Sequence, residues 1–105
     1  MARGSGREAV LGTVKLYATL RQRAGGQRDV EIPWTRGDSV IEVLRELLRL
    51  QPGLDGHVLG PDESVLPYVS IFLDGRDVRY LGGLGTLLDG ETEIAIFPPV
   101  AGGDR

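Results

Sequence analysis

The chain of 105 residues contains no cysteine and only one histidine, His57. The absence of cysteine excludes disulfides, thiol nucleophiles, iron–sulfur clusters and cysteine zinc sites. A single histidine excludes a multi-histidine metal site, and any Ser-His-Asp triad would have to use His57. Because His57 follows the loop-like stretch Leu54-Asp55-Gly56, we expect a surface residue there. The sequence therefore predicts no metal site.

Long apolar runs and clusters of positive charge are also missing. No 18 consecutive residues are apolar, and the first ten residues, MARGSGREAV, contain no apolar core of a signal peptide. The net charge is -3, with 12 basic and 15 acidic residues interspersed. These absences predict a cytoplasmic protein of one domain that binds neither membrane nor nucleic acid.

Apolar periodicity in the first half predicts a hairpin followed by a helix. Residues 14–18 and 28–33 alternate between apolar and polar side chains, as in strands, with residues 19–24 looping or coiling between them. Ser39 followed by Glu42 forms the pattern of a capping box, and apolar residues then recur at helical spacing. Pro52 and Gly53 end this pattern, so we expect a helix over about 40–51.

The second half predicts three further strands. Residues 55–67 read as a loop, 68–73 as a strand, and Asp74-Gly75 as a hairpin turn that leads into a short returning strand over 77–81. The Gly82–Gly85 stretch is interpreted as a tight turn, and 91–97 as the last strand. The order β-β-α-β-β-β predicts an α+β fold, in which one main helix packs on one face of a mixed sheet.

No group of residues has the pattern of a catalytic site. The carboxylates that could pair for acid–base chemistry fall at predicted turns and strand starts, where solvated carboxylates are expected: Asp74, Asp77, Asp89, Glu91 and Glu93. The glycines of 82–85 match no phosphate-binding loop. The sequence therefore predicts that the protein is not an enzyme.

The end of the chain, FPPVAGGDR, follows directly on an apolar strand. Pro98 and Pro99 lack backbone donors and end the ladder, and Gly102 and Gly103 have no side chain to bury. Such a stretch is either a frayed end or a segment that threads through a narrow channel. The expected organisation is a flexible lead over 1–10, a folded domain over 11–98 and a flexible tail over 99–105 that carries Gly-Gly.

Four stretches together resemble the MoaD/ThiS family of sulfur carriers, which have a ubiquitin-like β-grasp fold: VKLYATLRQRAGG, SVIEVLRELLRLQPGL, LDGRDVRYLGGL and LLDGETEIAIFPPVAGG. The resemblance covers about residues 14–103, and its most specific part is the last stretch. It implies that an E1-like enzyme adenylates the carboxylate of Gly103 with Mg-ATP, after which sulfur converts it to a thiocarboxylate. Gly102 would provide clearance, and the protein would hold no cofactor of its own.

The resemblance also implies partners. A carrier of this kind delivers sulfur to a biosynthetic enzyme, for example of molybdopterin, cysteine, thiamin, thiolated tRNA or another sulfur metabolite, in some cases as the small subunit of the enzyme complex. Asp104 and Arg105 depart from the usual ending and resemble the extension of precursors that a JAMM-type metallopeptidase trims. Two alternatives remain: a ubiquitin-like modifier joined through Gly103 to lysines, and a β-grasp binding module without tail chemistry.

The alternation of the strands places four aromatic residues on the sheet face opposite the helix: Tyr17, Tyr68, Phe72 and Phe97. Four exposed aromatics on one face predict a docking surface for partner enzymes, with a homodimer interface as the alternative. By the resemblance, Tyr17 and Phe97 align with positions that contact the enzymes of the family.

Overall fold

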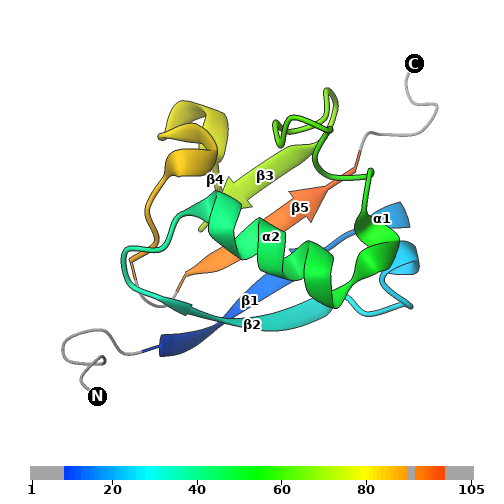
Figure 1. The fold of residues 1–105 in the computed structure, drawn as a ribbon, viewed down its shortest axis with the longest axis horizontal. Helices are drawn as coiled ribbons and strands as arrows, with labels where there is room; N and C mark the ends of the chain where they lie inside the picture. Colours follow the sequence, from blue (N-terminus) through cyan, green and yellow to red (C-terminus); the bar gives the residue numbers. More distant parts are fainter. Residues whose placement is uncertain (1–8, 90–91, 99–105) are drawn as a thin grey trace.

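The computed structural model describes residues 9–89 and 92–98 and shows a helix packed on a five-stranded sheet (Figure 1). The strand order is β2-β1-β5-β3-β4. The strands are β1 (Ala9–Leu16), β2 (Asp29–Thr35), β3 (Ser70–Leu73), β4 (Arg76–Asp77) and β5 (Glu93–Phe97). Only β1 and β5 pair in parallel, so the sheet is mixed. The predicted α+β architecture is confirmed.

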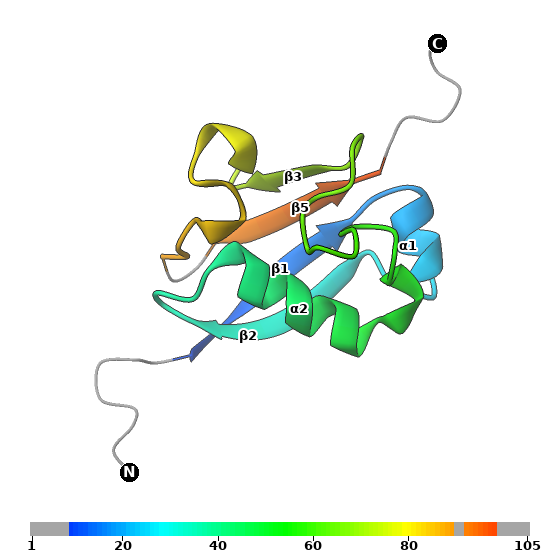
Figure 2. The same ribbon diagram turned by 45° about the horizontal axis from the view of Figure 1, so that its top comes forward.

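The core lies between the sheet and α2 (Val40–Leu50). Val14 of β1 pairs with Ile94 of β5, which also pairs with Leu73 of β3, and all three side chains are buried. One face of α2 covers them with Val40, Val43, Leu44 and Leu47. Figure 2 shows α2 on one side of the sheet, and the described residues place no helix over the other side.

The start of α2 follows the predicted capping box. The backbone N–H of Ser39 donates to Glu42 Oε1 at 2.7 Å, which satisfies a donor that the helix itself leaves unpaired. The helix ends at Leu50, one residue before the predicted end, and the 3-10 helix η1 (Pro52–Leu54) follows. A further short helix, α1 (Thr19–Arg23), occupies the stretch predicted to loop or coil between β1 and β2.

The returning strand predicted over 77–81 is wrong. Strand β4 ends at Asp77, and Val78–Tyr80 form the 3-10 helix η2. The cause is the side chain of Asp77, which accepts a hydrogen bond of 2.9 Å from the backbone N–H of Arg79 and so caps a turn at the point where a ladder would continue.

Several strand boundaries also differ from the prediction, since β1 ends at Leu16, β2 spans Asp29–Thr35 and β5 begins at Glu93. Strand β3 begins at Ser70 and not at Tyr68, because Tyr68 has a φ of 88°, which no strand residue adopts. Strand β1 begins at Ala9, so Ala9 and Val10 belong to the sheet and not to the predicted lead over 1–10. The first eight residues, Glu91 and the tail over 99–105 lie outside the described residues.

Gly12 marks a close approach between β1 and β2. The indole of Trp34, only 2 % exposed, lies against the Gly12 backbone, and an added Cβ would overlap its ring carbons Cζ2 and Cη2. We expect Gly12→Ala to lower the free energy of unfolding by about 1–3 kcal/mol, because overpacking displaces a buried ring. Denaturant unfolding followed by tryptophan fluorescence measures this loss.

Gly85→Ala is the matched control, because a Cβ at Gly85 meets no atom within 4 Å. The control variant should unfold close to wild type. Equal stabilities of the Gly12 and Gly85 variants would contradict a tightly packed Trp34.

Candidate functional site

The open face of the sheet carries a cluster of aromatic rings at the end where β1 and β5 finish. The rings of Tyr17 and Phe97 stack with centroids 4.4 Å apart and an interplanar angle of 10°. Phe72 of β3 meets Phe97 edge-on, with centroids 5.5 Å apart. These residues follow or precede buried Leu16, Ile71 and Ile96 along the chain, and side chains alternate between the faces of a sheet. The rings therefore lie opposite the core.

Tyr68 joins this cluster across a groove of about 440 Å³ that Phe72, Phe97 and Pro98 also line. The Tyr68 side chain is 83 % exposed, and Phe97 is 37 % exposed. We call the four residues Tyr17, Tyr68, Phe72 and Phe97 the aromatic surface. The structure brings together all four residues that the sequence assigned to one face, although the turn at Tyr68 places it beyond the end of β3.

One ion pair lies beside the aromatic surface. Lys15 Nζ of β1 is 3.1 Å from Glu93 Oε2 of β5. The hydrogen bond with Glu93 raises the pKa of the Lys15 amine above its ordinary value, which itself lies well above neutral pH, so this amine is protonated at neutral pH. Lys15 is the only lysine of the chain, and its protonated amine is a poor nucleophile.

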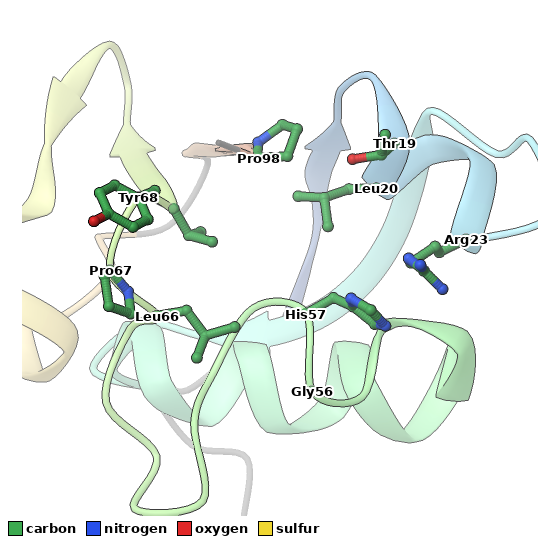
Figure 3. Close-up of a pocket in the computed structure, with 10 residues that line it drawn as sticks. Thr19, Leu20, Arg23, Gly56, His57, Leu66, Pro67, Tyr68 and Pro98 are labelled. Atoms are coloured by element: carbon green, nitrogen blue, oxygen red, sulfur yellow. The ribbon is translucent and has the colours of Figure 1, made fainter. Parts of the chain in front are cut away.

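Figure 3 shows a second groove, which shares part of its lining with the first. It measures about 410 Å³, and Pro98 and Tyr68 line it as well as the first groove. Arg23 of α1 and His57 also line it. Sequence reasoning missed this pair, because 33 residues separate Arg23 from His57 and a packing contact between α1 and η1 brings their segments together.

The predicted tail residues Gly102, Gly103, Asp104 and Arg105 lie outside the described residues. Pro98, the last described residue, lines both grooves, so the tail begins beside them. The chain therefore leaves the folded domain directly beside the aromatic surface.

The buried carboxylate of Asp77 serves the fold. Its Oδ2 accepts from the Arg79 guanidinium at 2.6 Å, and this bond, with the Arg79 backbone N–H, holds the pKa of Asp77 below its ordinary value.

Within residues 9–89 and 92–98, no three His, Asp or Glu side chains gather where they could hold a metal ion. In the same part of the chain, no helix is both long enough and apolar enough to cross a membrane.

Comparison with protein families matches residues 14–103 to the ThiS family. The small archaeal modifier protein 3 of Haloferax volcanii is 37% identical over 92 residues, which cover 86% of this chain and 96% of the relative. The sulfur carrier protein CysO of Mycobacterium tuberculosis is 31% identical over 93 residues, 87% of this chain and 97% of the relative.

Solved structures agree with these relatives. The crystal structure of SAMP1 from Haloferax volcanii superposes with a TM-score of 0.78 at 28% identity, covering 91% of this chain and 100% of SAMP1. A chain of the Amycolatopsis orientalis BexX/CysO complex superposes with a TM-score of 0.75 at 27% identity, covering 88% of this chain and 99% of its own length. The mixed sheet and main helix are thus those of a ubiquitin-like β-grasp protein.

Proposed function

Because the chain belongs to the ThiS family and its relatives are small sulfur carriers and modifiers, not catalysts, we propose that it carries sulfur on the carboxylate of Gly103. The observation that supports this most strongly is the extent of the family match, which includes Gly102 and ends at Gly103. Asp104 and Arg105 fall beyond the match. They are the extension that a JAMM-type metallopeptidase removes.

The chemistry starts from the carboxylate that trimming exposes. With a pKa of about 3.3–3.7, a terminal carboxyl is an anion at neutral pH and does not react with sulfide on its own. In the site of an E1-like enzyme, a carboxylate oxygen of Gly103 attacks the α-phosphate of Mg-ATP and displaces pyrophosphate. A sulfur donor then displaces AMP and leaves the thiocarboxylate.

The geometry around Pro98 suits this role. The aromatic surface offers an anchor for a partner enzyme, and the tail starts at its edge. Five residues from Pro98 to Gly103 reach about 17 Å when extended, enough to enter a partner's active site. An enzyme that holds the aromatic surface therefore has the glycine end within about 17 Å of Pro98. The acceptor of the sulfur is a biosynthetic enzyme, for example of cysteine or molybdopterin.

The intact mass of the protein isolated from its native cells tests this proposal. We expect a chain that ends at Gly103, with a fraction in which one oxygen is replaced by sulfur. A population that retains Asp104 and Arg105 throughout, with no sulfur-containing form, would contradict the proposal and favour a binding module without tail chemistry.

The presence of small archaeal modifiers among the relatives supports a second candidate function, conjugation of Gly103 to lysines of other proteins. Lys15→Arg tests whether the chain's own amine takes part in sulfur delivery. We expect unchanged sulfur delivery, because arginine keeps the charge that pairs with Glu93 and a carrier needs no amine. Sulfur transfer from the trimmed chain to an acceptor enzyme is the measurement.

The detection of conjugates in cells would contradict a function limited to sulfur transport. Proteins of higher mass in cells, linked through a Gly103 isopeptide bond, would favour the modifier. A loss of sulfur delivery in Lys15→Arg would instead show that the Lys15 amine itself takes part.

A further inference from the structure

The groove lined by Arg23 and His57 lies between α1, the segment after η1 and the stretch that leads into β3. We call it the α1 groove. Its floor is apolar, since Leu20 and Val69 are 2 % and 8 % exposed. In Figure 3, Pro98 stands at the rim between Tyr68 and Thr19, and Arg23 and His57 lie together at one end. The α1 groove is thus an apolar channel with a polar end.

The polar end is held in place by close packing. Gly53 of η1 lies so close to α1 that an added Cβ would overlap the carbonyl oxygen of Arg23. The side-chain amide of Gln51 also donates to Gln27 Oε1 at 2.9 Å, which ties the end of α2 to the segment after α1. Arg23 and His57 therefore come from segments that are fixed against each other.

The charge at this end is not neutralised. No carboxylate lines the α1 groove, and in the described part of the chain no ion pair or side-chain hydrogen bond uses Arg23 or His57. By contrast, the guanidinium groups of Arg45 and Arg79 are each paired with a carboxylate, Glu63 and Asp77. An unpaired guanidinium presents N–H donors in a geometry that can bind both oxygens of a carboxylate.

We propose that the α1 groove is the resting site of the chain's own C-terminal segment, residues 99–103, with the Gly103 carboxylate on Arg23 and His57. The inference rests on the proposed function in one respect, that trimming exposes this carboxylate. The segment begins at the rim, because Pro98 itself lines the groove. Val100 and Ala101 match the apolar floor, and Gly103 can lie up to about 17 Å from Pro98 when the segment is extended.

Such a site has a consequence for the carrier. The carboxylate, and the thiocarboxylate formed from it, would be held on the domain by Arg23 and His57 between encounters with partners. Tyr17, Phe72 and Phe97 of the aromatic surface do not line the α1 groove and stay accessible, so a partner docks on them first and the tail then leaves the groove.

Nuclear magnetic resonance of two forms of the trimmed chain tests the proposal, one ending in the Gly103 carboxylate and one in the Gly103 carboxamide. All described strands and helices end before residue 99, so the removal of Asp104 and Arg105 leaves the core whole. The two forms have equal length and differ only in the terminal group, which is an anionic carboxylate in one and a neutral amide in the other. We expect the amide resonances of Arg23, Gly56 and His57 to differ between them.

Two variants sharpen the test. Arg23→Gln should abolish the difference, whereas Arg21→Gln, an exposed arginine of the same helix outside the groove, should retain it. Differences confined to residues 99–103, or unchanged in Arg23→Gln, would overturn the proposal. The experiment uses no ATP, sulfur or activating enzyme, so its failure is distinguishable from a failure of the proposed function.

Discussion

Removal of Asp104 and Arg105 is expected to turn a chain that cannot be activated into a substrate of the E1-like enzyme. In the full chain, the carbonyl of Gly103 is part of a peptide bond and offers no anionic oxygen to the α-phosphate of ATP. A carboxylate further along would have to bring the side chains of Asp104 and Arg105 into a channel that admits glycine. We therefore expect ATP–pyrophosphate exchange at background level for the full chain and rapid exchange for the chain that ends at Gly103.

The comparison needs one activating enzyme, free of peptidase. An alanine added after Gly103 of the trimmed chain should return the exchange to background level. The terminal carboxylate then lies one residue further along the chain, on a residue that carries a Cβ. Asp104→Ala in the full chain is the matched control and should stay at background, since it removes a charge but leaves Gly103 in a peptide bond. Equal exchange by the full and trimmed chains would contradict the role of Asp104 and Arg105 as a removable cover.

The elements that could be predicted from the sequence are those whose signals are local. The helix over 40–51 was predictable because its capping residues, Ser39 and Glu42, and its apolar period agree, and α2 spans Val40–Leu50. The strand over 77–81 failed because a single side-chain hydrogen bond, from the Arg79 N–H to Asp77, outcompetes the ladder. The alternation of apolar and polar residues in the sequence does not indicate that such a side-chain hydrogen bond will form.

The two grooves of the candidate site also differ in how far local sequence signals could predict them. The aromatic surface could be predicted because strand alternation assigns Tyr17, Phe72 and Phe97 to one face, and the rings do meet there. The α1 groove could not, because Arg23 and His57 lie on separate segments. Their meeting depends on the contact of Gly53 with the end of α1, which is a property of the packed fold.

The double substitution Tyr17→Ala with Phe97→Ala in the trimmed chain is expected to weaken docking without loss of the fold. Both rings lie on the face opposite the core, and Phe97 is already 37 % exposed. The stacking of the two rings contributes about 0.5–1.5 kcal/mol beyond the area that they bury, against a stability of about 5–15 kcal/mol for an ordinary domain. Aromatic anchors at the centre of an interface cost about 2 kcal/mol or more when truncated.

This cost should be visible in the kinetics of activation. About 2 kcal/mol corresponds to roughly a 30-fold rise in the KM for the carrier, with kcat little changed, because the tail that reacts is intact. Tyr80→Ala is the matched control: Tyr80 is 83 % exposed like Tyr68, but it lies on η2 and lines neither groove. An unchanged KM in the folded double variant would exclude the aromatic surface as the docking site, and unfolding would show that these two rings support the domain itself.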